Sequence, residues 1–211
     1  AASLAHLKKK VLLIDTDPQA NATSGVGIDK AAIEQSIYNI LVDEVNINDV
    51  ILKTAYENLD IVPSSIALAG AEVELVSAIS REQRMKNAIS EIKEKYNYVV
   101  IDCPPSLGLI TLNSLTAANG VIIPVQTEYY ALEGLSQLMN TFNIVRKHLN
   151  SKLDIFGVLL TMTDSRTNIS NQVAEQVREH FKDKAFNTVI SRTVRLSEAP
   201  SFGEPIIEYA K

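Results

Sequence analysis

The chain has 211 residues, of which 46% are hydrophobic and 21% charged, a composition typical of a globular protein large enough to bury a substantial core. Its 20 basic and 25 acidic side chains give a net charge of −5, so nucleic acid could bind only at a local basic patch. A single cysteine excludes an internal disulfide, and no apolar run is long enough to span a membrane.

Two apolar runs that end in aspartate are the most informative segments. Residues 11–14 lead into Asp15 and Asp17, and residues 98–101 lead into Asp102. A short apolar run bounded by turn residues is typical of a strand buried on both faces, as in a parallel sheet. Ligands bind such sheets beyond the carboxyl ends of the strands, so we expect the three aspartates to meet at one crevice. Clustered carboxylates repel one another unless a cation compensates, and the simplest candidate is Mg²⁺ carrying a nucleotide.

Further strands and helices alternate along the chain, which predicts an α/β fold with a mostly parallel sheet. Residues 29–52 are less regular and are expected to form short helices over the sheet. The expected strands are Lys10–Asp15, Leu59–Pro63, Tyr98–Asp102, Val121–Val125, Ile155–Thr161 and Thr188–Ile190, and the expected helices are Arg81–Lys95, Leu132–Leu149 and Ile169–Phe181.

Four segments together resemble a known family. Residues 15–25 read Asp-Thr-Asp-Pro-Gln-Ala-Asn-Ala-Thr-Ser-Gly, residues 98–108 have a Walker B pattern followed by Pro-Pro, and residues 124–134 and 194–201 are also family-like. The chain resembles the ParA/MinD family of deviant-Walker ATPases over essentially its whole length, and most closely the Soj-like chromosomal ParA branch. The resemblance implies a three-layer P-loop NTPase-like fold, with a mostly parallel sheet flanked by helices, and a single ATPase domain over residues 1–211.

One family motif does not occur in these residues. The phosphate-binding loop has the form K-G-G-x-G-K-[ST], and no glycine of this chain is followed by lysine. Residues 1–7 look like the last turns of the helix that follows such a loop. We therefore expect the sequence to begin inside that helix and to stop before the family's terminal helix, so that the domain is truncated at both ends.

The resemblance implies that ATP and Mg²⁺ are the cofactors and assigns roles to the three aspartates. Asp17 falls in switch I and is the candidate catalytic residue, positioned near the water that attacks the γ-phosphate. Asp15 and Asp102 are candidate Mg²⁺ ligands that act through bound waters, and all three residues are expected to contribute to the cofactor site. The alternative for Asp17 is a helix N-cap, because Pro18 suits the first helical position.

Four residues in the C-terminal half of the chain complete the candidate sites. The resemblance implies that residues 190–193 lie near the adenine, so Ser191 and Thr193 are candidate cofactor-binding residues, although the family often has proline and asparagine at these two places. Arg166 and Arg195 occupy positions where Soj-like proteins contact DNA phosphates without reading sequence. The guanidinium fork suits phosphate, although an isolated arginine is more often solvated or paired with a carboxylate.

The function implied is an ATP-dependent molecular switch. It would dimerise with ATP, bind DNA non-specifically and act with a ParB-like (Spo0J-like) partner in chromosome or plasmid partitioning, in the cytoplasm and on the nucleoid. One alternative is a MinD-like membrane-associated division ATPase, although Arg195 and the motif at residues 129–134 favour the DNA-linked branch. The others are a biosynthetic ligase of the same superfamily, with a bound small-molecule acid, and a non-catalytic binding fragment.

Overall fold

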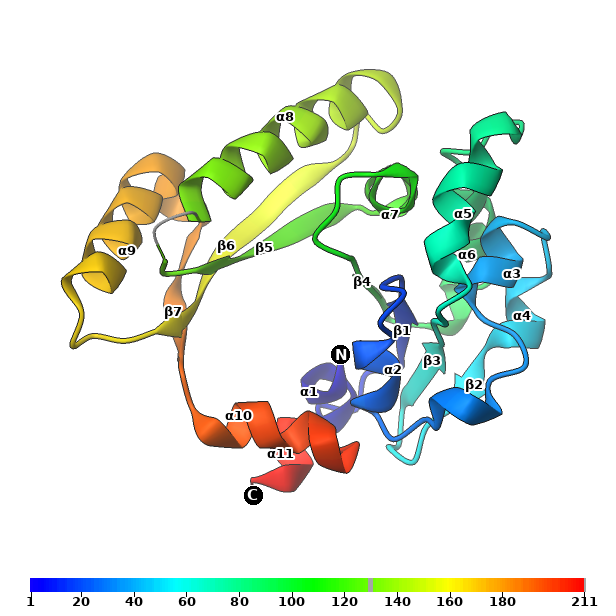
Figure 1. The fold of residues 1–211 in the computed structure, drawn as a ribbon, viewed down its shortest axis with the longest axis horizontal. Coiled ribbons are helices and arrows are strands. Elements are labelled where there is room, and N and C mark those ends of the chain that lie inside the picture. Colours follow the sequence, from blue (N-terminus) through cyan, green and yellow to red (C-terminus); the bar gives the residue numbers. More distant parts are fainter. Residues whose placement is uncertain (129–130, 211) are drawn as a thin grey trace. The chain divides into compact units, whose positions relative to one another are not determined.

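The computed structural model describes residues 1–128 and 131–210 (Figure 1). Tyr129 and Tyr130, which belong to the motif at residues 124–134, lie outside the described residues. The chain forms two compact units, one made of residues 1–117 with the segment that begins at Arg195, and the other of residues 118–194. Each unit is built around its own mostly parallel sheet.

The strands are β1 Val11–Asp15, β2 Leu52–Lys53, β3 Leu59–Val62, β4 Tyr98–Asp102, β5 Gly120–Gln126, β6 Asp154–Thr163 and β7 Ala185–Ser191. The α-helices are α1 Ala2–His6, α2 Asn21–Ser24, α3 Ile37–Leu41, α4 Ile47–Val50, α5 Leu68–Glu74, α6 Arg84–Ser90, α7 Leu109–Ala117, α8 Ala131–His148, α9 Asn168–Phe181, α10 Val194–Glu198 and α11 Ile206–Tyr209. Short 3₁₀ helices are η1 Lys30–Ala32, η2 Leu75–Ser77, η3 Lys93–Lys95, η4 Lys182–Lys184 and η5 Ala199–Phe202.

The sheet of the first unit has the strand order β2-β3-β1-β4. Strand β1 is parallel to both β3 and β4, whereas the short β2 pairs antiparallel with β3. The register of β1 and β4 sets Asp15 opposite Asp102. Because β1 lies between two parallel partners, the carboxyl ends of three strands meet at the same edge, as predicted from the two apolar runs.

Strand β1 is buried on both faces, which confirms the prediction for residues 11–14. Leu12 and Ile14 pack with the helices α3 to α7 on one face of the sheet. Val11 and Leu13 pack on the other face with Ala5 of α1 and with residues that follow α2. The unit therefore has helices on both sides of the sheet, and the predicted three-layer α/β fold is confirmed. Strand β4 is only partly buried, because it is the edge strand of this sheet.

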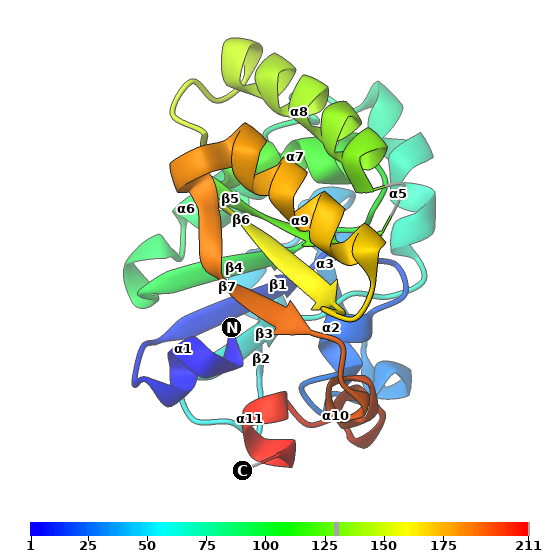
Figure 2. The same cartoon turned by 90° about the vertical axis from the view of Figure 1, so that its left-hand side faces the viewer.

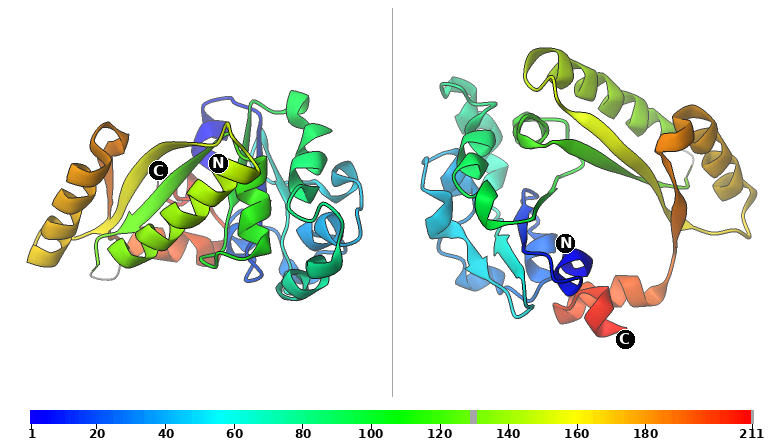
Figure 3. Two further views of the ribbon diagram at one scale, coloured as in Figure 1. Left: turned by 90° about the horizontal axis from the view of Figure 1, so that it is seen from above. Right: turned by 180° about the vertical axis from the view of Figure 1, so that it is seen from behind.

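The segment after Arg195 packs against the rest of the first unit (Figure 3). Gly27 and Gly203 both have positive φ, and a Cβ on Gly203 would lie 3.1 Å from the Cα of Gly27. The Tyr56 hydroxyl donates to the Gly203 carbonyl at 3.2 Å. Any side chain at either glycine would be strained in this backbone conformation and would push the two loops apart.

The second unit contains the parallel sheet β5-β6-β7, with α8 and α9 packed next to each other against it (Figures 1 and 2). Its core joins the strand residues Val125 and Leu160 to Leu135 of α8 and Val177 of α9. The periodic apolar residues predicted these two helices to within one residue at each end.

Two further helices, α5 and α7, were not predicted. The nine residues of α7 include several buried polar side chains that obscure an amphipathic pattern. These side chains donate to backbone carbonyls of their own helix, since Asn113, Ser114 and Thr116 bond to the residues four positions earlier. The predicted helix Arg81–Lys95 is shorter, covering α6 and the separate turn η3.

Candidate active site at the carboxyl ends of β1 and β4

Asp15 ends β1 as a fully buried carboxylate with several hydrogen bonds. Its Oδ1 accepts from the backbone N–H of Asp17 at 3.1 Å. Its Oδ2 accepts from both the backbone N–H and the hydroxyl of Thr23, each at 2.7 Å. A carboxylate has about four acceptor positions, so three are already used within the protein. Asp15 therefore holds the loop between β1 and α2 in place and has little capacity left for direct metal coordination.

Thr23 is a functional candidate that the sequence did not reveal. It is fully buried, and its hydroxyl donates to Asp15 while accepting from the backbone N–H of Ser64 at 3.0 Å. Ser64 follows β3, so one hydroxyl joins the carboxyl end of β3 to that of β1. The only sequence pattern that contains Thr23 is the family-like run at residues 15–25, and no periodicity distinguishes this position.

Asp17 lies in the loop after β1 and is partly exposed. Its carboxylate accepts from the backbone N–H of Gln19 at 2.9 Å, and its backbone carbonyl accepts from the N–H of Ala20. Helix α2 begins four residues after Asp17, with Ala20 at its N-cap in the left-handed region. Asp17 therefore closes a tight turn and is not the helix N-cap that was the alternative interpretation. A second carboxylate oxygen remains available to a ligand.

Lys30 supports the same turn from η1. Its ammonium group donates to the carbonyl of Gln19 at 2.6 Å. The turn that carries Asp17 is thus held from inside by Asp15 and from outside by Lys30. A sequence search could not have found this contact, because it depends on how the loop folds back over residues 19–30.

Asp102 is the exposed member of the carboxylate group. Its pKa is raised above the usual aspartate value, first because the surrounding protein partly desolvates the carboxyl group and then because of the charges of Asp15 and Asp17. Thr16 fixes the backbone here, since its N–H and its hydroxyl both donate to the Asp102 carbonyl, at 2.9 and 2.6 Å. The charges of Asp15 and Asp17 act on this pKa in the same direction as desolvation, in keeping with the register that sets Asp15 opposite Asp102.

This donor set suits a hydrated divalent cation. Within residues 1–128 and 131–210, no group of three or more histidine, cysteine, aspartate or glutamate side chains is arranged to hold a metal ion directly. Mg²⁺ commonly retains several waters and binds through one or two carboxylates plus phosphate oxygens. Asp102 and the remaining acceptor position of Asp15 fit that mode, because each can accept from a metal-bound water.

The residues predicted near the adenine lie at the end of β7 in the second unit. Ser191 is the last residue of β7, and its hydroxyl accepts from that of Thr163 at 3.3 Å. Thr193 follows in the connection to α10 and is exposed. These two residues and the three aspartates belong to different units, so the structure brings together the aspartates but does not place them against Ser191 and Thr193.

Arg166 follows β6 in the second unit and is exposed. Its guanidinium group forms a two-pronged pair with Asp164, with Nε–Oδ1 and Nη2–Oδ2 distances of 2.9 and 2.7 Å. These bonds lower the pKa of Asp164 to about 2. Arg192, at the end of β7, adds a smaller contribution of the same sign. Arg195 lies in α10 and is also exposed, but it belongs to the first unit.

The parallel sheets, the covering helices and the aspartates at the strand ends define an α/β protein of the P-loop NTPase class. Residues 1–155 match a family model described as an AAA domain. The chain is 61% identical to the sporulation initiation inhibitor protein Soj of Bacillus subtilis, over 99% of this chain and 82% of that protein. It is 51% identical to the chromosome partitioning protein ParA of Myxococcus xanthus, over 99% of this chain and 74% of that protein. The chain therefore belongs to the Soj/ParA family of chromosome-partitioning ATPases.

Solved structures are similar to this fold as well. Cobyrinic acid a,c-diamide synthase from Mycobacterium smegmatis, solved with a bound ATP analogue and magnesium, superimposes with a TM-score of 0.85. It is 34% identical, and the match covers 99% of this chain and 86% of that chain. In the part of the chain that the structure describes, no helix is both long enough and apolar enough to cross a membrane.

Proposed function

We propose that this protein is an ATP-dependent molecular switch that acts in chromosome or plasmid partitioning. The observation that carries the proposal is the group formed by Asp15, Asp17 and Asp102 at the carboxyl ends of parallel strands. Desolvation first, and then the charges of Asp15 and Asp17, raise the pKa of Asp102, and a bound cation would offset these effects. Family membership and the magnesium-bound, nucleotide-bound relative support Mg²⁺ and ATP as the cofactors.

Each aspartate has a distinct task in this proposal. Magnesium-bound ATP supplies the phosphoryl group and neutralises part of its charge. Asp102 accepts hydrogen bonds from the waters of the cation, and Asp15 fixes the loop through Thr23 and the Asp17 N–H. Asp17 orients the attacking water with the carboxylate oxygen that the Gln19 N–H does not engage. Ser191 and Thr193 would contact the adenine, at two positions where this chain departs from the family pattern.

The output of the switch is non-specific DNA binding by an ATP-dependent dimer. Arg166 and Arg195 provide contacts to phosphate, which read no sequence and weaken steeply with salt. Two of the five N–H donors of the Arg166 guanidinium group bond to Asp164, so the Asp164 carboxylate competes with a phosphate for this side chain. A ParB-like partner stimulates hydrolysis and releases the DNA. Because the proposed partners are DNA and a ParB-like protein, we place the protein in the cytoplasm and on the nucleoid.

The 211-residue polypeptide by itself is expected to hydrolyse ATP poorly or not at all. It contains no Gly-Lys-Ser or Gly-Lys-Thr, whose backbone N–H groups and lysine supply much of the phosphate binding. Assays that need nucleotide are therefore designed for a polypeptide in which residues 1–211 follow the family's phosphate-binding loop, called here the loop-bearing protein. Hydrolysis by the 211-residue chain above a no-enzyme control would contradict this expectation.

A biosynthetic ligase is the second candidate function, favoured by the likeness to cobyrinic acid a,c-diamide synthase. A ligase would consume ATP in proportion to product and would not respond to DNA. The switch would hydrolyse ATP slowly and accelerate with DNA and the partner protein. Measuring ATPase activity of the loop-bearing protein with and without duplex DNA separates these two functions.

The direct test of DNA binding uses Arg166→Glu and Arg195→Glu in the loop-bearing protein. We expect either change to abolish ATP-dependent DNA retention while sparing dimerisation, measured by size-exclusion chromatography with a slowly hydrolysed ATP analogue. Arg178→Glu is the matched control, because Arg178 is exposed in the last turn of α9 and carries the same charge. Unchanged DNA retention by both variants would reject these arginines, and loss of dimerisation would assign them to the subunit interface instead.

A further inference from the structure

A group of lysines lies at the amino-terminal ends of the strands in the first unit, the edge opposite to Asp15 and Asp102. Its members precede β1, belong to β2 or precede β4. We call this group the lysine edge: Lys8, Lys9, Lys10, Lys53, Lys93 and Lys95. Lys10, Lys53 and Lys95 line one open hollow, together with residues at the start of β3. The Lys10 N–H donates to the side-chain oxygen of Asn97, and the Asn97 N–H donates to the Lys10 carbonyl, which holds the β1 and β4 ends of this edge together.

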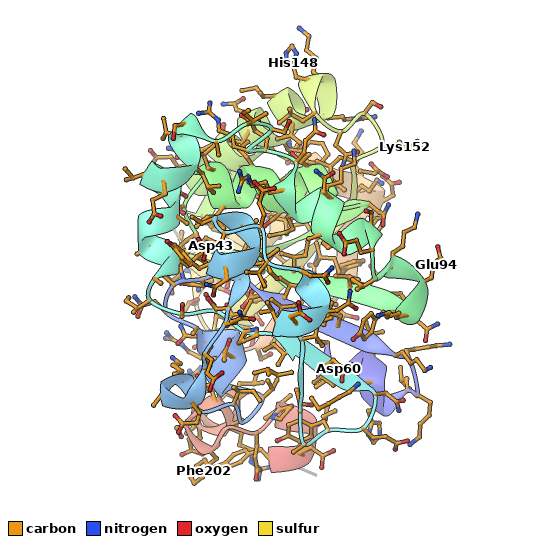
Figure 4. The ribbon with its side chains drawn as sticks, turned by 90° about the vertical axis from the view of Figure 1, so that its right-hand side faces the viewer. Asp43, Asp60, Glu94, His148, Lys152 and Phe202 are labelled. Atoms are coloured by element: carbon orange, nitrogen blue, oxygen red, sulfur yellow. The ribbon has the colours of Figure 1, made fainter. Side chains whose placement is uncertain are left out.

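The carboxylates on this edge do not cancel the positive charge. Asp60 is 8% exposed and already accepts from Lys53 at 2.7 Å and from the Tyr96 hydroxyl at 2.8 Å. Glu57 pairs with Lys8 at 3.1 Å, but both side chains are about three-quarters exposed, so solvent screens the pair and it opens easily. Figure 4 shows Asp60 and Glu94 on the side of the molecule where this edge lies. The lysines therefore outnumber the acids in a chain whose net charge is −5.

The nucleotide site does not account for this charge. Ligands of parallel sheets bind at the carboxyl ends of the strands, whereas these lysines lie at the amino ends. All six are exposed on flexible stems, and the hollow lined by Lys10, Lys53 and Lys95 is open. A spread of ammonium groups around an open surface suits a row of phosphates better than it suits one enclosed anion.

Two other polyanionic partners fit this surface less well. A membrane surface would need a continuous apolar face next to the lysines, and the exposed Leu7, Leu52 and Tyr98 come from three separate segments that do not form one. Single-stranded nucleic acid would need exposed aromatic rings for stacking. The hydroxyls of Tyr56 and Tyr96 are bonded to Gly203 and Asp60, which keeps both rings tied to the protein. Tyr98, at the start of β4, is exposed, but one ring is too few to stack successive bases. Duplex DNA requires neither feature.

We infer that the lysine edge is a second contact surface for the phosphate backbone of duplex DNA, and that it acts without nucleotide. The inference extends the proposed DNA binding but involves neither Arg166, nor Arg195, nor the ATP-dependent dimer. Such a surface would bind weakly and with strong salt dependence. It would keep the protein close to DNA after ATP hydrolysis has released the tighter contact.

The test uses the 211-residue chain without nucleotide, so it does not depend on the phosphate-binding loop. Fluorescence anisotropy measures binding to a duplex of about 30 base pairs at about 50 and 200 mM salt. The triple variant Lys9→Glu, Lys10→Glu and Lys93→Glu removes the edge charge. The control triple variant Lys86→Glu, Lys147→Glu and Lys152→Glu changes three exposed lysines elsewhere by the same charge. Circular dichroism verifies that each protein is folded, and Lys9→Gln, Lys10→Gln and Lys93→Gln replaces the first variant if it is not.

We expect the edge variant to lose affinity by about tenfold or more at low salt, with a shallower salt dependence, and the control to lose much less. Equal losses in both variants, or no binding by the parent chain, would overturn the inference. So would binding to phosphatidylserine vesicles but not to the duplex, or loss of this binding in Arg166→Glu. Edge-dependent binding combined with no ATP-dependent retention by the loop-bearing protein would leave the inference standing and reject the proposed function alone.

Discussion

The carboxyl ends of the two sheets carry charged groups in opposite physical settings. At the end of β1, Asp15 is fully buried and accepts three hydrogen bonds. After β6, Arg166 is exposed and is held only by Asp164, two residues away. The first arrangement is a preorganised network whose loss disturbs the fold. The second is a surface pair that salt and competing anions can open.

The pKa values express the same difference. Asp102 has a raised pKa, first because the surrounding protein desolvates its carboxyl group, so a nearby cation would favour its charged state. Asp164 has a pKa lowered to about 2, so its charge and that of Arg166 are constant over physiological pH. The aspartate site is therefore sensitive to metal and pH, whereas the arginine site is sensitive to salt.

Asp17→Ala in the loop-bearing protein is expected to have the largest effect. Hydrolysis should fall by about a hundredfold or more, because the water that attacks the γ-phosphate is no longer oriented, while nucleotide affinity changes little. Single-turnover hydrolysis and binding of a fluorescent ATP analogue measure the two quantities. The variant should also stay trapped on DNA. Parental hydrolysis with DNA and partner present would exclude Asp17 as the catalytic carboxylate.

Asp102→Ala should weaken Mg²⁺-dependent nucleotide binding by about ten- to a hundredfold, as loss of an outer-sphere metal partner commonly does. A Mg²⁺ titration at fixed nucleotide measures this, with Asp164→Ala as a control that should not respond. Unchanged Mg²⁺ dependence would remove Asp102 from the site.

Asp102→Asn provides the pH test of the same site. The folded state raises the pKa of Asp102. The protonated carboxyl group of Asp102 therefore contributes stability below the ordinary aspartate pKa, and this contribution is lost as pH rises through the raised pKa. Without metal, the variant should therefore be more stable than the parent at neutral pH and equally stable in acid. Thermal unfolding across pH measures this difference in stability. A variant that is less stable than the parent at neutral pH would contradict the raised pKa of Asp102.

Thr23→Val tests the buried network with a side chain of the same shape. It removes the hydroxyl that donates to Asp15 and accepts from the Ser64 N–H, leaving both groups buried with fewer partners. We expect a loss of about 2–4 kcal/mol in the free energy of unfolding, measured by urea denaturation. Thr23→Ser keeps the hydroxyl and should recover most of the lost free energy of unfolding. A larger loss in Thr23→Ser than in Thr23→Val would show that packing of the methyl group, and not the network, matters here.

Asp164→Asn should have the smallest effect, and it should strengthen DNA binding instead of weakening a function. It weakens the hold on Arg166 and removes a negative charge from the same loop, so ATP-dependent DNA binding should tighten by about two- to fivefold at low salt. DNA retention by the loop-bearing protein at two salt concentrations measures this. Weaker binding would show that Asp164 positions Arg166 for DNA.

The sequence predicted the fold class and the aspartate cluster because both depend on local patterns. A continuous apolar run specifies β1, and parallel pairing then brings Asp15 and Asp102 to one edge. The sequence did not predict α7, because its buried polar side chains hide the apolar face. Ser114 and Thr116 donate to carbonyls of their own helix, and Asn113 also bonds to the Arg81 carbonyl and the Met85 N–H. Thr23 was missed because its bond to Ser64 joins residues 41 positions apart.

The lysine edge was missed for a similar reason. Residues 8–10, Lys53 and residues 93–95 each look like ordinary solvated lysines when they are read in sequence. Only the pairing of β1 with β3 and β4, and of β2 with β3, brings these lysines to one edge, where Lys10, Lys53 and Lys95 line the same hollow.

The central claim is that the carboxyl ends of β1 and β4 form the Mg²⁺–nucleotide site. The most direct measurement is a crystal structure of the loop-bearing protein with Mg²⁺ and a slowly hydrolysed ATP analogue. The account predicts that waters of the Mg²⁺ ion lie within hydrogen-bonding distance of Asp102, and that Asp15 keeps its bonds to Thr23. A Mg²⁺–nucleotide complex bound away from Asp102, with the three aspartates facing only solvent, would contradict it.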